Sequence, residues 1–312
     1  AWYETYEELL ADSHVDAVTI CTPIGLHYKQ GLQAIAAGKH IHFNKTQSIT
    51  VAESDEIIEK ARAKGVKIVS SPGGIMTFPF YQRMRRAVLE DRLGLLAWAY
   101  ADNDVGGGSY HLTGDRGNDI VGGGVNPDWY FKKPAGGPQY DVAVYSLTGA
   151  VGILGPVKRV MAMSGQRYPS HTYQGRTINN EMDDSVTLVL DYGDGFHLIC
   201  NSVIANSIVR GKAFVPNIYG SAGKIVDGFL NGVSLIYPED HQPHIFGRHL
   251  TLKENHVVED ILQLVDLVRD GIPSVATPEF ARHVIEIIEA GFRAAQTGQT
   301  QTLRTTCDVL PL

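Results

Sequence analysis

The sequence predicts an α/β domain built on a parallel sheet, followed by an α+β domain built on a mainly antiparallel sheet. Three observations predict this order. Strand-like and helix-like segments alternate through the first 75 residues, alternating segments joined by turn signals dominate the chain after about residue 155, and 312 residues suit two domains. We place the domains at residues 1–75 and 76–312.

The first 75 residues have the pattern of βαβ units. After an amphipathic helix near the start, short apolar runs predict strands at residues 16–21, 41–43 and 66–69. A helix over residues 27–37 ends at Gly38, and Thr50 with Glu53 forms the capping box of a second helix that ends at Gly65. Strands separated by helices of this length pair in parallel, and ligands usually bind at the carboxyl edge of such a sheet.

The longer second region mixes helices with period-2 segments. Predicted helices cover residues 80–91, 139–154 and 257–269, and predicted strands cover residues 95–101, 157–163, 185–192, 196–205, 214–219 and 233–237. Thr277 as N-cap and Pro278 at the first helical position begin a last helix. The glycine-rich segment 106–124 is either a flexible surface loop or a substrate lid.

Composition narrows the class of protein. The 27 Lys and Arg side chains against 34 Asp and Glu give a net charge of −7, which disfavours an extended nucleic-acid-binding face and favours small-molecule ligands. No apolar run approaches the roughly 18–20 residues needed to span a bilayer. Cys21, Cys200 and Cys307 are far apart and odd in number, which favours a reducing compartment, the cytoplasm, over a disulfide framework.

No phosphate-binding glycine motif of the G-x-G-x-x-G or P-loop type occurs, so a nucleotide site rests on other residues. Thr22-Pro23 and Asn44-Lys45 directly follow two consecutive parallel strands and therefore lie at one edge of the sheet. This placement directs Lys45 at the ligand crevice. The alternative is an exposed lysine that merely ends a strand.

Two segments carry a resemblance to a known family. VDAVTICTPIGLH (15–27) and AGKHIHFNKT (37–46) resemble the Gfo/Idh/MocA family of NAD(P)-dependent oxidoreductases, and the similarity continues through Gly136-Gly137, the segment 141–145 and the turn 276–279. The resemblance implies a Rossmann domain, an open-faced sheet domain whose closing helices return toward the first domain, and a nicotinamide cofactor, NAD or NADP, between the two.

Position by position, the resemblance implies cofactor contacts along the sheet edge from Thr22, Pro23, His27, Asn44 and Lys45. Asn44 and Thr46 replace the family's glutamate and proline, which removes a carboxylate and an X-Pro bond that could hold the loop in cis. The family's first strand, glycine turn, helix and second strand, roughly 60 residues, have no counterpart before Ala1. We expect an upstream segment absent from this sequence, the alternative being a lost pyrophosphate site.

The resemblance also implies catalytic residues. Lys45 matches the family lysine, Asp141 the aspartate of its D-x-x-x-H motif, and Tyr145 stands at the histidine, as in the glucose-fructose oxidoreductase and dihydrodiol dehydrogenase branch. Residues four apart share a helix face, so Asp141 and Tyr145 can point at one substrate. Lys45 or Tyr145 would be the general base and Asp141 would orient the substrate. The alternative for Tyr145 is a buried core tyrosine.

Two further clusters are weaker. Trp129 and Tyr130 precede the predicted substrate helix and form either a stacking surface for a sugar ring or a hydrophobic anchor. His241, His244 and His249 lie around a proline and a glycine that break helical register, which favours a polar surface loop, and we expect no metal site.

Together these features predict an oxidoreductase that acts on a hydroxyl or carbonyl carbon of a sugar, cyclitol or related diol. The alternatives are a non-catalytic carbohydrate-binding or assembly relative and an NAD-dependent glycoside-cleaving enzyme that works by transient oxidation and elimination. Apolar strands at residues 186–190 and 197–200 build a sheet without an evident covering helix, so we expect a homodimer or homotetramer.

Overall fold

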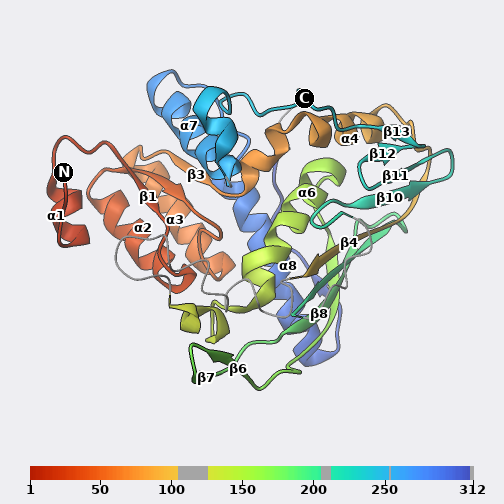
Figure 1. Cartoon of the computed structure of the whole chain (residues 1–312), viewed down its shortest axis with the longest axis horizontal. Coiled ribbons are helices and arrows are strands. Elements are labelled where there is room, and N and C mark those ends of the chain that lie inside the picture. Colours follow the sequence, from red (N-terminus) through yellow and green to blue (C-terminus); the bar gives the residue numbers. More distant parts are fainter. Residues whose placement is uncertain (105–125, 205–211, 253, 310–312) are drawn as a thin grey trace.

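The computed structural model describes residues 1–104, 126–204, 212–252 and 254–309, and it contains two main sheets (Figure 1). The first is parallel with the strand order β1-β2-β3, formed by β1 (Ala17–Ile20), β2 (His40–Phe43) and β3 (Ile68–Ser70). Helices α1 (Tyr6–Ala11), α2 (His27–Ala36) and α3 (Val51–Lys64) belong to this region. The predicted βαβ pattern is confirmed.

Local sequence signals fix the helices of this region. The Thr50 side chain accepts a hydrogen bond from the Glu53 backbone while the Glu53 side chain bonds back to the cap, which is the predicted capping box. Gly65 ends α3 in the left-handed conformation, with φ 73°. Ile41 and Phe43 of β2 have no exposed surface, as expected for a parallel sheet covered on its faces.

The second sheet has nine strands in the order β13-β12-β11-β10-β4-β9-β8-β5-β14. They are β4 (Leu96–Asp104), β5 (Arg159–Gly165), β8 (Ser185–Asp191), β9 (His197–Val203), β10 (Asn217–Gly220), β11 (Lys224–Val226), β12 (Phe229–Leu230), β13 (Val233–Ser234) and β14 (Gln301–Thr302). Pairing is antiparallel except between β4 and β9, which run parallel. A separate hairpin of β6 (Ser170–Tyr173) and β7 (Arg176–Asn179) was not predicted.

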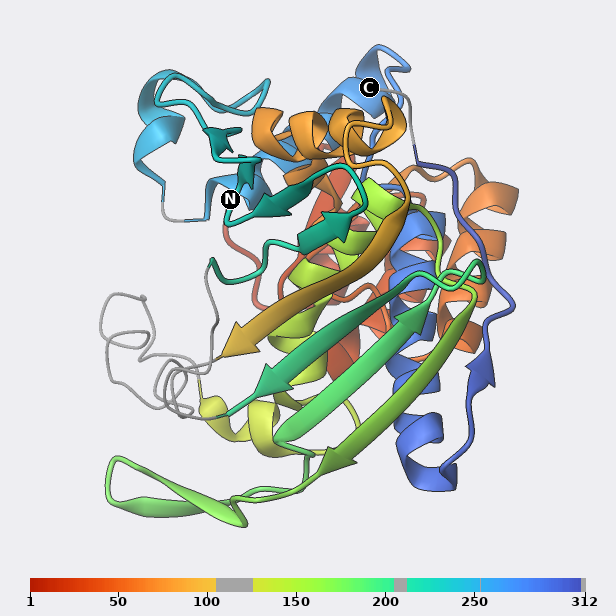
Figure 2. The same ribbon diagram turned by 90° about the vertical axis from the view of Figure 1, so that its right-hand side faces the viewer.

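Helices cover one face of this sheet. Figure 2 shows the strands toward the viewer with α6 (Val144–Leu154) and α8 (Pro278–Thr297) behind them. The inner side chains of the strands form the larger core with these helices, and fully buried examples are Leu190 and Leu198. Among the described residues, no helix lies over the opposite face.

The remaining helices connect the two sheets. α4 (Pro79–Leu89) follows the first sheet, while α7 (Asn255–Arg269) packs against β2 and β3, and α8 packs against β3 and α3. The C-terminal helices therefore return to the first sheet, although the division near residue 75 stays a prediction. The glycine-rich segment 106–124 lies outside the described residues. No described helix combines the length and apolar character needed to cross a bilayer.

Candidate active site

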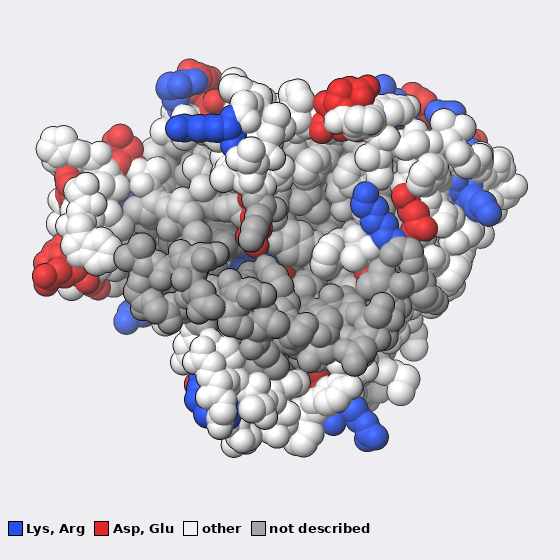
Figure 3. All heavy atoms as spheres, viewed as in Figure 1, with Lys and Arg blue, Asp and Glu red and all other residues white. Residues whose placement is uncertain are grey.

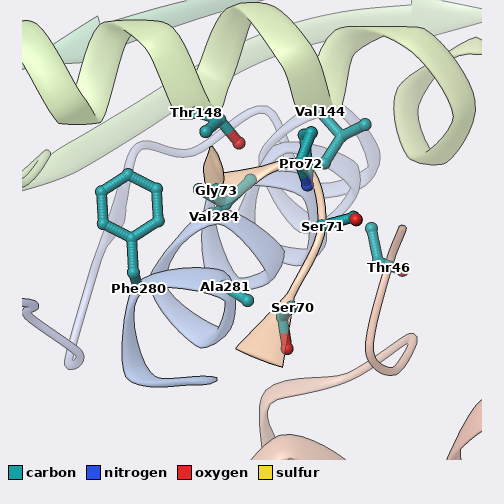
Figure 4. Close-up of a pocket in the computed structure, with 10 residues that line it drawn as sticks. All are labelled: Thr46, Ser70, Ser71, Pro72, Gly73, Val144, Thr148, Phe280, Ala281 and Val284. Carbon is teal, nitrogen blue, oxygen red and sulfur yellow. The ribbon is translucent and has the colours of Figure 1, made fainter. Parts of the chain in front are cut away.

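The candidate site lies at the carboxyl edge of the parallel sheet, where the segments after β2 and β3 meet α6. The segments that follow the strands begin at Cys21, Asn44 and Ser71, and the third continues into a 3₁₀ helix, Gly73–Thr77. Figure 4 shows the end of β3 beside α6 and α8, around a cavity of about 10 Å³ that suits one water molecule. Its lining includes Thr46 from the segment after β2.

Lys45 and Asp141 form a buried ion pair across this junction. The Lys45 ammonium donates to Asp141 Oδ1 at 2.5 Å and to the Asp141 backbone oxygen at 2.8 Å. The side chains are 15% and 4% exposed, so water screens the pair only weakly. An ammonium has three N–H donors, and the third has no acceptor among the described residues. Asp141 therefore holds Lys45 in place, and one N–H donor of the ammonium has no partner among the described residues.

Asp141 occupies an unusual stretch of helix. Gln139–Ala143 form a π-helical turn, and α6 continues from Val144. The sequence predicts one regular helix over 139–154, so the π turn is a difference that spacing alone did not reveal. Such turns are rare and concentrate at functional sites. The π turn brings Asp141 Oδ1 and the Asp141 backbone oxygen within hydrogen-bond distance of Lys45, which follows β2.

Tyr145 lies in the first turn of α6, beside the ion pair. Lys45 Nζ is 5.3 Å from the centre of the Tyr145 ring, within the range of a cation–π contact. The predicted trio of Lys45, Asp141 and Tyr145 is thus brought together. The Tyr145 ring is partly buried and contacts Phe214 with 5.6 Å between ring centres.

Sequence analysis missed His256, which pairs with Tyr145. The Tyr145 hydroxyl and His256 Nε2 are 3.1 Å apart, and the rings meet edge to face with centres 5.4 Å apart. Burial lowers the pKa of His256 to about 4, with Glu254 opposing and Lys45 adding to the shift. The contact joins residues 111 positions apart, and no motif marked the histidine.

His27 is buried beside the site, and its ring contacts the segments that follow β1 and β2. It is 1% exposed, with Nδ1 2.6 Å from the Thr46 backbone oxygen and Nε2 2.8 Å from the Thr22 backbone oxygen. Burial lowers its pKa, although these carbonyl contacts oppose the shift. The expectation of a direct cofactor contact from His27 is corrected, because its ring instead joins the segments after β1 and β2.

The other residues predicted at the cofactor edge remain accessible. Thr22 is partly exposed and donates to Gln30, while Pro23 is exposed. Asn44 is half-buried and accepts the Lys45 backbone N–H at 2.7 Å. The peptide bond from Lys45 to Thr46 is cis although no proline follows the lysine.

Trp129 and Tyr130, which are adjacent in the sequence, differ in exposure. Tyr130 has no exposed surface and meets Trp129 and Phe131 edge to face, with ring centres 5.7 and 5.0 Å apart. This corrects the expectation that Tyr130 stacks on a sugar, and its ring is a hydrophobic anchor. Trp129 keeps partial exposure, so its substrate contact stays a prediction.

The histidine-rich segment is tied to α7. His244 Nδ1 is 3.0 Å from Glu259 Oε1 and Nε2 is 2.7 Å from Asp266 Oδ2. Burial lowers the His244 pKa, but the two carboxylates outweigh it and the net shift is upward. Among the described residues, no three His, Cys, Asp or Glu side chains are arranged to hold a metal ion.

Two models of known protein families match this chain. The model described as "Oxidoreductase family, NAD-binding Rossmann fold" matches residues 1–71, and the model described as "GFO/IDH/MocA C-terminal domain" matches residues 81–226. The chain is similar to mouse trans-1,2-dihydrobenzene-1,2-diol dehydrogenase, 24% identical over 82% of this chain and 75% of the relative. It is also similar to D-xylose 1-dehydrogenase (NADP(+)) of Hypocrea jecorina, 30% identical over 47% of this chain and 36% of the relative.

Solved structures share the fold. Aldose-aldose oxidoreductase from Caulobacter crescentus aligns with a TM-score of 0.68 and 21% identity over 96% of this chain and 83% of that chain. GenD2 from gentamicin A biosynthesis, solved with NAD, aligns with a TM-score of 0.70 and 19% identity over 97% and 82%. With residues 1–71 and 81–226 matched by the family's two models, the chain belongs to the GFO/IDH/MocA family of oxidoreductases.

Proposed function

We propose that this oxidoreductase transfers a hydride between NAD or NADP and a hydroxyl or carbonyl carbon of a sugar, cyclitol or related diol. The observation that carries the proposal is the buried Lys45–Asp141 pair beside Tyr145 at the carboxyl edge of the parallel sheet. The names of its relatives, dihydrodiol, D-xylose and 1,5-anhydro-D-fructose enzymes, support the substrate class.

The sheet edge suits a nicotinamide cofactor. Ligands of open α/β sheets bind outside the carboxyl ends of the strands, where Thr22, Pro23 and Asn44 are accessible. These three residues would hold the nicotinamide end. When bound, the cofactor supplies or accepts the hydride. The protein's own task is to place the substrate carbon and manage its proton.

Lys45 is arranged to bind the reacting oxygen of the substrate. Asp141 takes two of its N–H donors, which fixes the ammonium, and the third can point at a substrate oxygen. A fixed positive charge in a site of low water content stabilises negative charge that develops on that oxygen. Tyr145, whose ring centre is 5.3 Å from Lys45 Nζ, would take or give the substrate's proton.

The charge distribution fits an uncharged substrate. Among the described residues on the face in Figure 3, Lys and Arg side chains are scattered and do not gather into one patch. The strongest positive group of the site, Lys45, is already paired with Asp141. A sugar or diol hydroxyl needs donors and acceptors rather than net charge, and this pair with Tyr145 offers both.

Two measurements test this function. Titration of the full-length natural protein with NAD(H) and NADP(H), followed by fluorescence, should show saturable binding. D-xylose, 1,5-anhydro-D-fructose and trans-1,2-dihydrobenzene-1,2-diol should be screened for cofactor turnover by the same protein. Lys45→Met should abolish turnover but retain cofactor binding, while Lys67→Met, an exposed lysine of the same sheet region, should behave as wild type. Absence of binding to either cofactor at millimolar concentration would overturn the proposal.

The uncovered face of the large sheet supports self-association. Trp98, Tyr100 and Tyr219 stack on it, with Trp98 and Tyr219 ring centres 5.5 Å apart, and Met161 and Met163 are 52% and 81% exposed. Apolar surface of this kind marks interfaces. A homodimer or homotetramer joined through this face should be visible by light scattering. A 34.1 kDa monomer at micromolar concentration would contradict it.

The cysteines support a cytoplasmic location. Cys21, Cys200 and Cys307 are all unpaired, and Cys21 is exposed. An exposed thiol is easier to keep reduced in the cytoplasm than outside the cell. Subcellular fractionation of the natural protein tests this, and recovery outside the cytoplasmic fraction would contradict it.

A further inference from the structure

We propose that His256 is a positioning residue for Tyr145, which sets the direction of the tyrosine hydrogen bond and takes up the tyrosine proton during the reaction. The inference deepens the proposed function and rests on it. It adds a fourth side chain, from α7, to Lys45 after β2, Asp141 in the π-helical turn and Tyr145 on α6. None of the predicted catalytic positions includes it.

The proposal assigns a direction to this contact, in which Tyr145 donates and His256 accepts. A neutral imidazole with Nε2 unprotonated accepts from the Tyr145 hydroxyl across 3.1 Å. The phenol oxygen then offers its lone pairs, rather than its hydrogen, to a substrate. Since Lys45 can donate to the same substrate oxygen, a substrate hydroxyl would have one donor partner and one acceptor partner.

The surroundings keep His256 neutral. The charged or titratable groups that act on it are Lys45 after β2, Glu254 just before α7, and His42 on β2, besides the hydroxyl of Tyr145 on α6. The lysine disfavours an imidazolium and Glu254 favours it, while burial has the larger effect and disfavours it. The ring is therefore neutral in the resting enzyme, which leaves one of its two nitrogens unprotonated and able to accept a hydrogen bond.

α7 is held so that His256 stays in reach. Asp260 lies four residues after His256, on the same helix face, and has no exposed surface. Its carboxylate accepts from Ser71 Oγ at 2.5 Å and from the Gly74 backbone at 2.7 Å. Both partners follow β3, so the first turns of α7 are tied to the strand ends on which the site is built.

This arrangement completes the proton balance of alcohol oxidation. As the hydride leaves carbon for the cofactor, the substrate O–H bond breaks and its electron pair forms the carbonyl. The released proton bonds to the Tyr145 oxygen, and the original phenol proton moves to His256 Nε2. Reduction runs the same steps backward. Because burial disfavours the imidazolium, His256 does not keep the extra proton, and its Nδ1 proton leaves to water at this partly exposed residue.

A measurement without turnover tests the hydrogen bond. In protein labelled with ¹⁵N-histidine, the His256 resonances are those lost in His256→Gln. They should show an unprotonated Nε2 at neutral pH, and Tyr145→Phe should shift the Nε2 resonance. A protonated Nε2, or an Nε2 shift unaffected by Tyr145→Phe, would overturn the inference.

Kinetics tests the proton step. His256→Gln keeps an acceptor of similar size but cannot take a proton, so kcat should fall at least about tenfold while KM and cofactor affinity change little. The loss should be much smaller in a Tyr145→Phe background. His14→Gln, at an exposed histidine near the N-terminus, is the matched control.

The outcomes separate the two proposals. If His256→Gln folds, judged by its thermal unfolding, and retains wild-type kcat while Lys45→Met loses it, the role of His256 is refuted and the proposed function stands. If the wild type binds neither cofactor, the proposed function fails, whereas the Tyr145–His256 hydrogen bond is still decided by the ¹⁵N spectra.

Discussion

Replacing Asp260 with asparagine should change how the stability of this protein depends on pH. The carboxyl is fully buried and accepts hydrogen bonds from Ser71 and from the Gly74 backbone. Asparagine can keep both contacts, because Oδ1 can accept from Gly74 while Nδ2 donates to the serine oxygen. The substitution therefore removes a titrating group with little change of shape.

The size of the effect follows from the pKa. Burial raises the pKa of Asp260 from 3.8 to about 7, with Ser71 and Gly74 opposing the shift and Glu259 adding to it. At about 1.36 kcal/mol per pKa unit this amounts to about 4 kcal/mol. Between pH 3.8 and about 7 the folded protein keeps the proton that the unfolded chain has lost. The free energy of unfolding therefore falls as pH rises through this window.

Urea unfolding at several pH values from about 5 to about 8 measures this contribution. Relative to wild type, Asp260→Asn should gain stability as pH rises, by up to about 4 kcal/mol across the full window. Glu59→Gln, an exposed carboxyl on α3, is the control and should follow wild type. If the difference between Asp260→Asn and wild type is constant over this range, the argument from buried charge is wrong.

Two further substitutions test packing and capping. A Cβ on Gly136 would lie 2.1 Å from the backbone oxygen of Tyr130, so Gly136→Ala should destabilise by about 1–3 kcal/mol or more in urea unfolding, and an unchanged midpoint would contradict the close approach. Thr277 caps α8 by accepting the Phe280 N–H at 3.1 Å, so Thr277→Ala should cost about 1 kcal/mol, and Thr277→Ser, which keeps the hydroxyl, should restore most of it.

Features set by neighbouring residues were predictable from the sequence. Each helix end is set by residues within one turn of it. Examples are the capping box of Thr50 and Glu53, the left-handed Gly65 and the cap at Thr277. The placement of Lys45 at the ligand edge followed from its position directly after β2, because parallel strands all end at the same edge. The prediction that Lys45 and Asp141 belong to one site required the family resemblance as well as the spacing of the residues.

Features set by distant contacts were not predictable. His256 reaches Tyr145 only because α7 packs on the first sheet, and the burial of Tyr130 depends on Phe131 and its neighbours folding over it. The parallel pairing of β4 with β9 joins strands about a hundred residues apart and leaves no local pattern. The burial of a polar residue such as His27 cannot be predicted from local sequence, because it depends on which distant segments cover the residue.

The most direct test of the account is the kcat of Lys45→Met, set beside its affinity for the nicotinamide cofactor. In the proposed function, Asp141 holds this lysine through two hydrogen bonds, and its third N–H donor would bind the reacting oxygen. The account predicts a fall in kcat of roughly 10²-fold or more on the best substrate of the panel, with cofactor affinity nearly unchanged. A variant that turns over as fast as wild type would contradict it.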